Sequence, residues 1–286
     1  MTSKTHQAAA LRLPDGSRFE FERTRVMGIL NTTPDSFSDG GMYLDPQEAV
    51  ERALAMIQSG ADIIDVGGES TRPGSESVSA KEQIRRTTPV IQALRRVSKI
   101  PISIDTTSAE VAEQALEVGA SMVNDISAFR FDSRMIQLLA DTGVPAIAMH
   151  TLGRPTDMQR DPRYDNVVED VVQHLLSRVE ACKDAGIEPT QIVLDPGIGF
   201  GKTLEHNLAL LRHLPTLREH GHAILVGTSR KSFLGQLTGK DVNHRTEATA
   251  SSVAASIILG ADIVRVHDVE ELKDTVRVAD AIRHGT

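Results

Sequence analysis

Polar or ionisable side chains stand at the ends of the short apolar runs that recur along this sequence. In chain order they are Asn31, Asp65, Asp105, Asn124, Met149-His150, Asp195, Ser229-Arg230-Lys231 and Arg265-Val266-His267. Carboxylates can accept hydrogen bonds from the edge of a flat nitrogen-rich heterocycle, and an amide can both accept and donate them. Any one of these side chains could be a structural cap. Their recurrence after nearly every run predicts a shared site, in which Asp105, Asn124 and Asp195 contact the heterocycle.

Positive charge is contributed to the same site by Arg265, His267 and Arg72. Arginine holds phosphate oxygen atoms in bidentate fashion, so these residues predict a phosphate group beside the heterocycle. The helix expected after His267 begins with three acidic residues between positions 268 and 271, which already occupy its positive end. We therefore expect side chains, rather than this helix terminus, to hold the anion.

Three segments, residues 31–41, 67–74 and 195–202, are unusually polar or rich in glycine. The first two are long and have glycine near their ends, which is typical of loops that close over a substrate. Phe37 is a solitary aromatic residue in the first of them, which favours a functional role. The third lacks the Gly-Lys-Ser/Thr ending of a P-loop and the spacing of a dinucleotide-binding loop, so it says little alone.

The elements that position these residues follow a repeated pattern of a helical stripe, a glycine, a short apolar run and a polar residue. The pattern is clearest at 60–65, 119–124 and 260–265. A glycine just past a helix can adopt the left-handed conformation that ends it. The apolar run suits a strand buried on both faces. Alternating strands and amphipathic helices indicate βα units and a parallel sheet.

Eight such strands are expected, which predicts an α/β fold of the closed (β/α)8 barrel type. They should start near Val26, Ile63, Ile102, Met122, Ala146, Ile192, Ile224 and Ile263. The segment 11–21 carries a turn at 14–16 and should form a hairpin across the barrel floor. We expect one barrel domain over 11–286, preceded by a flexible tail over 1–10.

Three helix starts are predicted from N-cap residues. Asp45 precedes Pro46 and Glu48, which matches a cap followed by proline at the first helical position. The segment 107–110, Thr-Ser-Ala-Glu, matches a capping box, and the segment 268–271 repeats it with Asp268 as the cap.

The composition excludes several classes of protein. The chain has 286 residues and a formal net charge of −8 without a run of Lys or Arg, which argues against nucleic acid as a partner. No apolar run approaches the roughly 18 residues of a membrane span, and the N-terminus does not read as a signal peptide. We therefore expect a cytoplasmic protein with no membrane partner. Its single cysteine, Cys182, lies on an apolar helical stripe and should be a core residue.

Taken together, the motifs resemble those of the dihydropteroate synthase family, from about Val26 to Ile282. The fragments that carry the resemblance are 27–31, 33–41, 67–74, Ser103-Ile104-Asp105-Thr106, Asn124-Asp125-Ile126, Met149-His150, 195–202, Ser229-Arg230-Lys231-Ser232 and 265–268. Each fragment is modest evidence, but their occurrence in the family's order is specific. Thr32 stands where the family usually has Val, and Ser77 where Pro is common, so the packing of the loops is less certain than the activity.

The resemblance implies the condensation of a dihydropterin diphosphate with p-aminobenzoate, by a dissociative displacement under the two loops. It also implies Mg2+ as cofactor, sulfonamides as possible inhibitors and a homodimer. The implied pterin-binding residues are Asp105, Asn124, Met149, Asp195, Phe200 and Lys231. Asn31, Arg72, Arg265 and His267 would hold the diphosphate, with Asn31 also binding the metal.

The implied p-aminobenzoate site consists of Phe37, Thr71, Pro73, Phe200, Lys231 and Ser232, and Asp35 and Asp39 would lie in the first loop. The implied catalytic residues are Asp105, Asp195, Lys231, Arg265 and His267. Two alternatives stay open. A methyltetrahydrofolate:corrinoid methyltransferase would have no diphosphate to bind and no need for Arg72, Arg265 and His267 together. A non-catalytic pterin-binding homologue should have lost some residue of the polar set, and none is lost.

Overall fold

Eight parallel strands form a barrel, as predicted from the sequence. The computed structural model describes residues 8–33, 45–71 and 74–285. The barrel strands are β3 (Arg25–Asn31), β4 (Ile63–Gly67), β5 (Ile102–Asp105), β6 (Met122–Asp125), β7 (Ala146–Met149), β8 (Ile192–Asp195), β9 (Leu225–Val226) and β10 (Ile263–Val266). Their order is β8-β7-β6-β5-β4-β3-β10-β9. An isolated parallel bridge between Leu194 and Ile224 joins the two ends and closes the barrel.

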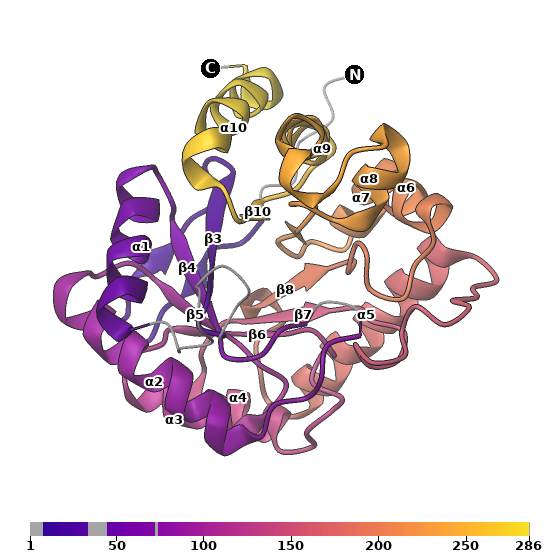
Figure 1. The fold of residues 1–286 in the computed structure, drawn as a ribbon. Helices are drawn as coiled ribbons and strands as arrows, with labels where there is room; N and C mark the ends of the chain where they lie inside the picture. The colour runs from indigo at the N-terminus through magenta and orange to yellow at the C-terminus, as the bar shows by residue number, and fades with distance from the viewer. Residues whose placement is uncertain (1–7, 34–44, 72–73, 286) are drawn as a thin grey trace.

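Helices form a layer around the strands (Figure 1). They are α1 (Pro46–Gln58), α2 (Ala80–Val97), α3 (Ala109–Glu117), α4 (Met135–Thr142), α5 (Val167–Asp184), α6 (Leu204–Arg212), α7 (Leu214–Arg218), α8 (Ser232–Thr238), α9 (Thr246–Ile258) and α10 (Val269–His284). Two short 3-10 helices are η1 (Pro189–Gln191) and η2 (Val242–His244). The main core lies between the helices and the strands. Cys182 is buried there on α5, as predicted, and burial raises the pKa of its thiol to about 11.

The N-terminal hairpin covers the floor of the barrel, which confirms the prediction. Strands β1 (Leu11–Arg12) and β2 (Arg18–Phe19) pair antiparallel, and the amide of Leu13 bonds to the carbonyl of Ser17. The hairpin's apolar side chains join those at the N-terminal ends of the barrel strands. This cluster contains Ala8, Leu11, Phe19, Phe21, Met27, Ile63, Met122, Ile147, Val193, Ala223, Leu225 and Ile263. The extents of the expected tail and of the single domain stay predictions.

One predicted helix start is confirmed and one is wrong. The carboxylate of Asp45 accepts a hydrogen bond from the amide of Gln47 at the start of α1, as expected. The capping box at 107–110 does not form. The N-cap residue of helix α3 is instead Ser108, one residue later, and its side chain makes no capping hydrogen bond. The reason is that the carboxylate of Asp132 accepts a hydrogen bond from the amide of Ala109 at 2.9 Å.

The prediction for Asp268 is confirmed for the residue that begins the helix and wrong for the capping interaction. Asp268 is the N-cap residue of α10, but its side chain does not cap the helix. Instead, both carboxylate oxygens bind the guanidinium of Arg230, at 2.9 Å from Nε and 2.5 Å from Nη2. The ion pair satisfies the carboxylate better than a neutral amide would, since charge-assisted bonds are the stronger ones.

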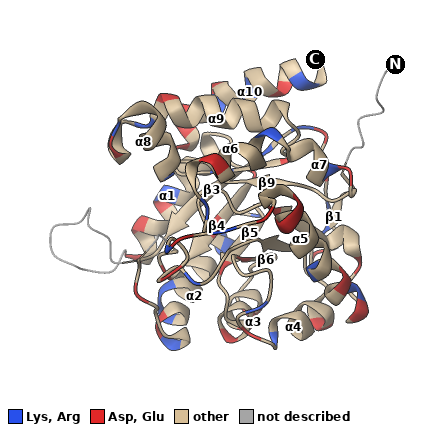
Figure 2. Ribbon diagram, turned by 90° about the vertical axis from the view of Figure 1, so that its right-hand side faces the viewer, with Lys and Arg blue, Asp and Glu red and all other residues tan. Residues whose placement is uncertain are grey.

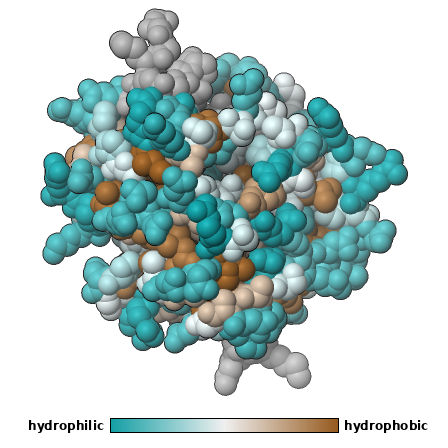
Figure 3. Space-filling model, turned by 90° about the horizontal axis from the view of Figure 1, so that it is seen from below, coloured by the Kyte–Doolittle hydropathy of each residue, from teal (hydrophilic) through white to brown (hydrophobic). Residues whose placement is uncertain are grey.

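Charged residues of both signs are spread over the described part of the chain. Figure 2 shows segments of Lys and Arg interspersed with segments of Asp and Glu. The face seen in Figure 3 is mostly hydrophilic, with small apolar patches between polar groups. Among the described helices, none combines the length and the apolar character needed to cross a bilayer.

Candidate active site

A cavity of about 400 Å3 opens at the C-terminal ends of the barrel strands. Of the residues at the strand ends, Asp65 and His150 do not line it, but it brings together every described residue that was given a role in the site. These are Asn31, Thr71, Asp105, Asn124, Met149, Asp195, Phe200, Lys231, Ser232, Arg265 and His267. The predictions for Asp35, Phe37, Asp39, Arg72 and Pro73 lie outside the described residues. The position of the cavity fits the fold, because the loops after barrel strands build the active sites of such barrels.

A shared guanidinium organises the base of the cavity. Arg265 on β10 donates from Nε to Oδ2 of Asp65 at 2.6 Å and from Nη2 to Oδ2 of Asp105 at 2.7 Å. Asn124 on β6 donates from Nδ2 to the same oxygen of Asp65 at 3.1 Å. Four strands are thereby joined by one network. Sequence reasoning found Asp65 at its strand end but gave it no role, since only the fold shows which side chains it holds.

Two acceptors of this network have no partner. Oδ1 of Asp65 and Oδ1 of Asp105 are buried without a hydrogen bond among the described residues. Buried polar atoms are nearly always paired in native proteins, so an unpaired carboxylate oxygen in a cavity indicates a place for a ligand's N–H group. Asp105 lines the cavity itself, whereas Asp65 lies behind it.

Burial shifts the pKa of the charged residues strongly. It raises the pKa of Asp105 to about 7 against the opposing effect of Arg265. It also raises the pKa of Asp195 to about 6, although the Gly197 amide and Lys231 favour the carboxylate. The pKa of Lys231 falls to about 7, again chiefly through burial. Burial acts to lower the pKa of Arg265 too, but Asp65 and Asp105 outweigh it and raise this pKa, so the guanidinium stays charged.

The glycine-rich loop after β8 packs closely on its surroundings. Gly197, Gly199 and Gly201 all have positive φ angles, of 69°, 83° and 63°. A Cβ atom at Gly197 would lie 1.8 Å from the carbonyl oxygen of His150, so no other residue fits there. The amide of Gly197 donates to Oδ1 of Asp195 at 2.7 Å.

This loop carries Phe200 to the cavity wall. The Phe200 ring packs with Ile126, Met149 and Met158, and Nζ of Lys231 lies 4.0 Å from the ring centroid. The result is an apolar wall with a cation beside it. Such a wall accepts the face of a flat ring, while the carboxylates below it accept the ring's edge.

Lys231 is aimed into the barrel by a strained turn after β9. Arg230 has a φ angle of 59°, unusual for a residue other than glycine. Its backbone amide donates to Oγ1 of Thr249 at 3.2 Å, and its side chain is fixed by Asp268. Ser229 Oγ lies 3.0 Å from Nδ1 of His267 and accepts the backbone amide of that histidine at 3.2 Å.

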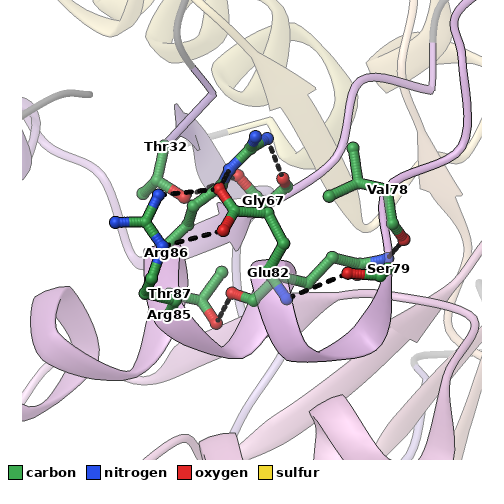
Figure 4. Close-up of polar contacts among 10 residues, drawn as sticks. Thr32, Gly67, Val78, Ser79, Glu82, Arg85, Arg86 and Thr87 are labelled. Carbon is green, nitrogen blue, oxygen red and sulfur yellow. Dashed lines mark hydrogen bonds and ion pairs between the residues drawn. The ribbon is translucent and has the colours of Figure 1, made fainter. Parts of the chain in front are cut away.

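The start of the segment after β4 is anchored to α2 and to β3 (Figure 4). Arg86 donates from Nη1 to the carbonyl of Gly68 at 3.0 Å and from Nε to Glu82 at 2.7 Å. Thr32 donates its hydroxyl to the carbonyl of Gly67 at 3.1 Å. The hydroxyl that distinguishes Thr32 from the family's usual Val therefore has a partner at the base of both loops.

Several residues that line the cavity were not predicted as site residues. They are Ile29, Ser70, Ile126, Met158, Ile198, Gly199, Gly227, Val242 and Arg245. The recognised motifs contain Ile29, Ser70, Ile126, Ile198 and Gly199. Ser229 and Arg230 also line the cavity; they belonged to the set at the strand ends but were given no role. Met158 and Val242 come from connecting segments without periodicity, so only the folded chain shows that they reach the cavity.

The described residues contain no group of three or more His, Cys, Asp or Glu side chains suited to a metal ion. An oxygen ligand is nevertheless present, because the Asn31 side chain lines the cavity and carries an amide oxygen. Mg2+ is commonly held by one or two protein oxygens together with substrate phosphates, so Asn31 fits Mg2+ bound with an anionic ligand.

Comparison with known proteins gives a consistent result. The family model described as pterin binding enzyme matches residues 27–267. A dihydropteroate synthase of Synechocystis sp. is 51% identical over 262 residues, which cover 91% of each chain. The crystal structure of Yersinia pestis dihydropteroate synthase with a sulfonamide drug complex superposes with a TM-score of 0.91 at 39% identity, covering 96% of this chain and 99% of that one.

Xanthomonas albilineans dihydropteroate synthase with 4-aminobenzoic acid superposes with a TM-score of 0.90 at 40% identity, covering 97% and 99% of the two chains. The matches span the barrel and every described residue of the cavity. The chain therefore belongs to the family of pterin-binding enzymes.

Proposed function

We propose that this protein catalyses the dihydropteroate synthase reaction, joining p-aminobenzoate to a 7,8-dihydropterin carried on a diphosphate. One observation carries the proposal: Arg265 is shared by Asp65 and Asp105, and the second oxygen of Asp105 is left unpaired in a cavity of about 400 Å3. The dihydropteroate synthases of similar sequence and structure support it.

The pterin ring would lie with its edge on Asp105, Asn124 and Asp195 and its face on Phe200 and Met149. An aminopyrimidinone edge carries both N–H donors and a carbonyl acceptor, which suits two carboxylates and an amide. The raised pKa values of the two aspartates leave them responsive to a ligand, because donors on the pterin would favour the carboxylate form. Lys231, beside Phe200, would add a hydrogen-bond donor.

The diphosphate would lie toward Arg265, His267 and Asn31. Arg265 lies in β10, His267 follows the last residue of that strand, and both line the cavity. Asn31 would hold Mg2+ through its side-chain oxygen, and the metal when bound would neutralise charge on the diphosphate. Arg72, which was also predicted to bind the diphosphate, would add a further cation.

p-Aminobenzoate would bind at the outer part of the cavity, near Thr71, Phe200, Lys231 and Ser232. Its amine would face the pterin methylene group. Its carboxylate would lie near the N-terminus of α8, which begins at Ser232. An arylamine is a neutral nucleophile at neutral pH, so the reaction needs no strong base.

The reaction breaks the bond between the pterin methylene carbon and the diphosphate oxygen, and the bonding electrons leave with diphosphate. The cation left on the pterin methylene group is delocalised into the ring and stabilised by the Asp105 and Asp195 carboxylates. The amine lone pair then forms the new carbon–nitrogen bond, and the nitrogen loses one proton. Holding both reactants in one cavity supplies much of the rate.

The test is release of pyrophosphate from dihydropterin diphosphate with Mg2+, measured with and without p-aminobenzoate. Release that depends on p-aminobenzoate, with stoichiometric 7,8-dihydropteroate, is the expected result. Tight pterin binding without turnover would instead establish a non-catalytic homologue. Methyl transfer from methyltetrahydrofolate to a corrinoid, without pyrophosphate release, would establish the methyltransferase.

The homodimer stays a prediction of the family resemblance, and the cytoplasmic location stays a prediction from the absence of a signal peptide and of a membrane span in the sequence. Exposed apolar side chains of α9 and α10, which pack together, include Ile258, Val278 and Ile282 and are suited to a subunit contact. Size-exclusion chromatography with light scattering measures the mass in solution, and a monomer at micromolar concentration would contradict the homodimer.

A further inference from the structure

Lys202 is the last residue of the glycine-rich loop 195–202, and its ammonium group lies buried beneath the cavity. Its side chain is only 3% exposed, and it does not line the cavity. None of the ion pairs found among the described residues includes it. A buried lysine without a paired carboxylate is costly, so its position calls for a specific reason.

The ammonium group has three acceptors around it. Nζ lies 2.9 Å from Nδ1 of His150, and it donates to the carbonyl of Phe200 at 3.0 Å and that of His150 at 3.4 Å. Burial and the charge of Lys202 lower the pKa of His150 to about 2, so the ring is neutral and its Nδ1 accepts the bond. Three acceptors match the three N–H groups of a charged ammonium.

These contacts fasten the end of β7 to the loop after β8. Phe200 is held at its carbonyl by Lys202, while its ring forms the cavity wall beside Lys231. The same loop is fixed further along, where Tyr164 donates its hydroxyl to the carbonyl of Gly201 at 2.8 Å. The position of the Phe200 ring therefore depends on the acceptor contacts of Lys202.

Lys202 also lies next to the backbone group that binds Asp195. Its Nζ is 3.4 Å from the position that a Cβ atom at Gly197 would occupy, and the Gly197 amide donates to Oδ1 of Asp195 at 2.7 Å. Burial lowers the pKa of Lys202 to about 7, and the Asp195 carboxylate opposes this shift. Lys202 in turn favours the charged form of Asp195, together with Lys231 and Arg265. The neighbouring titratable groups that lower the pKa of His150 are Lys202, His174 and Arg130.

We propose that Lys202 is a positioning residue, whose ammonium holds the Phe200 ring in place through His150 and the loop carbonyl and keeps Asp195 in its carboxylate form from behind the cavity. It touches no substrate, and its effect passes through Phe200 and Asp195. The proposal rests on the proposed function for its kinetic readout.

Lys202→Met and Lys202→Gln separate the two effects. Both remove the charge, and Gln retains N–H donors for the acceptors. We expect the acidic limb of the pH profile of kcat/KM to move upward by about half to one pH unit in both variants, because a nearby cation is lost. We expect KM for dihydropterin diphosphate to rise about tenfold in Lys202→Met, with a smaller rise in Lys202→Gln.

His150→Asn and Lys183→Met are the matched variants. An asparagine can still offer an acceptor to Lys202, so His150→Asn should retain the pH profile with a small rise in KM. Lys183 lies exposed on α5, so the loss of its charge should leave the pH profile and KM unchanged. If Lys202→Met does not fold, the pH profile of Lys202→Gln carries the test.

An unshifted acidic limb in folded Lys202 variants would overturn the proposal. So would a loss of kcat/KM by the same factor at every pH with a lowered melting temperature, since that result marks a purely structural residue. Absence of turnover in the unmodified protein would instead contradict the proposed function, and is recognised before any variant is made.

Discussion

The same strands contribute apolar side chains to the floor of the barrel and polar side chains to its mouth. On β3, Met27 is buried in the floor cluster while Asn31 lines the cavity, and on β10 Ile263 and Arg265 stand in the same relation two residues apart. The floor is apolar and closed by the hairpin. The mouth holds an unpaired carboxylate oxygen of Asp105 and the ammonium group of Lys231, whose pKa is lowered. The floor is thus expected to contribute to stability alone, whereas the mouth carries the chemistry and contributes to stability as well.

The largest expected effect is at the mouth. Arg265→Met should lower kcat/KM by about 10³-fold, comparable to the loss of a donor that stabilises developing charge. It should also reduce the free energy of unfolding by about 3–5 kcal/mol, because two buried carboxylates lose their counter-ion. Steady-state kinetics and urea denaturation measure both. A variant that loses activity at unchanged stability would show that the network is not structural.

A floor substitution should lower stability without changing activity. Leu11→Ala removes a side chain that is 1% exposed, and should reduce the free energy of unfolding by about 2–5 kcal/mol. Because Leu11 lies at the far end of the barrel from the cavity, kcat/KM should stay within about twofold of its original value. A tenfold fall in kcat/KM for folded Leu11→Ala would contradict the separation of the two ends.

The smallest effects come from two aspartates in similar sequence contexts. Asp45→Ala removes a helix cap outside the cavity and should cost about 1 kcal/mol of stability with unchanged activity. Asp268→Ala releases Arg230, and with it the turn that carries Lys231, so we expect kcat/KM to fall several-fold. Equal effects of the two variants on activity would indicate that the Arg230 ion pair does not hold the turn.

The repeated spacing of apolar residues and the turn residues predicted the barrel, because the sequence of each βα unit is enough to locate the strand and the helix of that unit. All eight strands were located from apolar runs, although β9 is reduced to two residues. The hairpin on the floor followed from the turn at 14–16. The caps at 107–110 and 268 failed because Asp132 and Arg230, both distant in sequence, compete for the same groups.

The candidate site was predictable as a set of residues but not as a network. Strand ends identified Asp65 and Asp105, yet only the folded barrel shows that both share Arg265. Lys202 was recognised within a glycine-rich motif, but nothing in the sequence distinguishes a buried cation from an exposed one. The predictions for Asp35, Phe37, Asp39, Arg72 and Pro73 stay predictions.

The shared guanidinium has a consequence for how inhibitors could be evaded. Asp65, Asp105, Asn124 and Arg265 are mutually dependent, so replacing one leaves a buried charge or donor without its partner. A compound whose affinity rests on this network therefore binds residues that cannot be exchanged singly without loss of function. A compound that relies on the outer part of the cavity, near residues such as Val242, meets side chains under no such constraint. Escape by a single substitution is accordingly expected at the rim and not at the base.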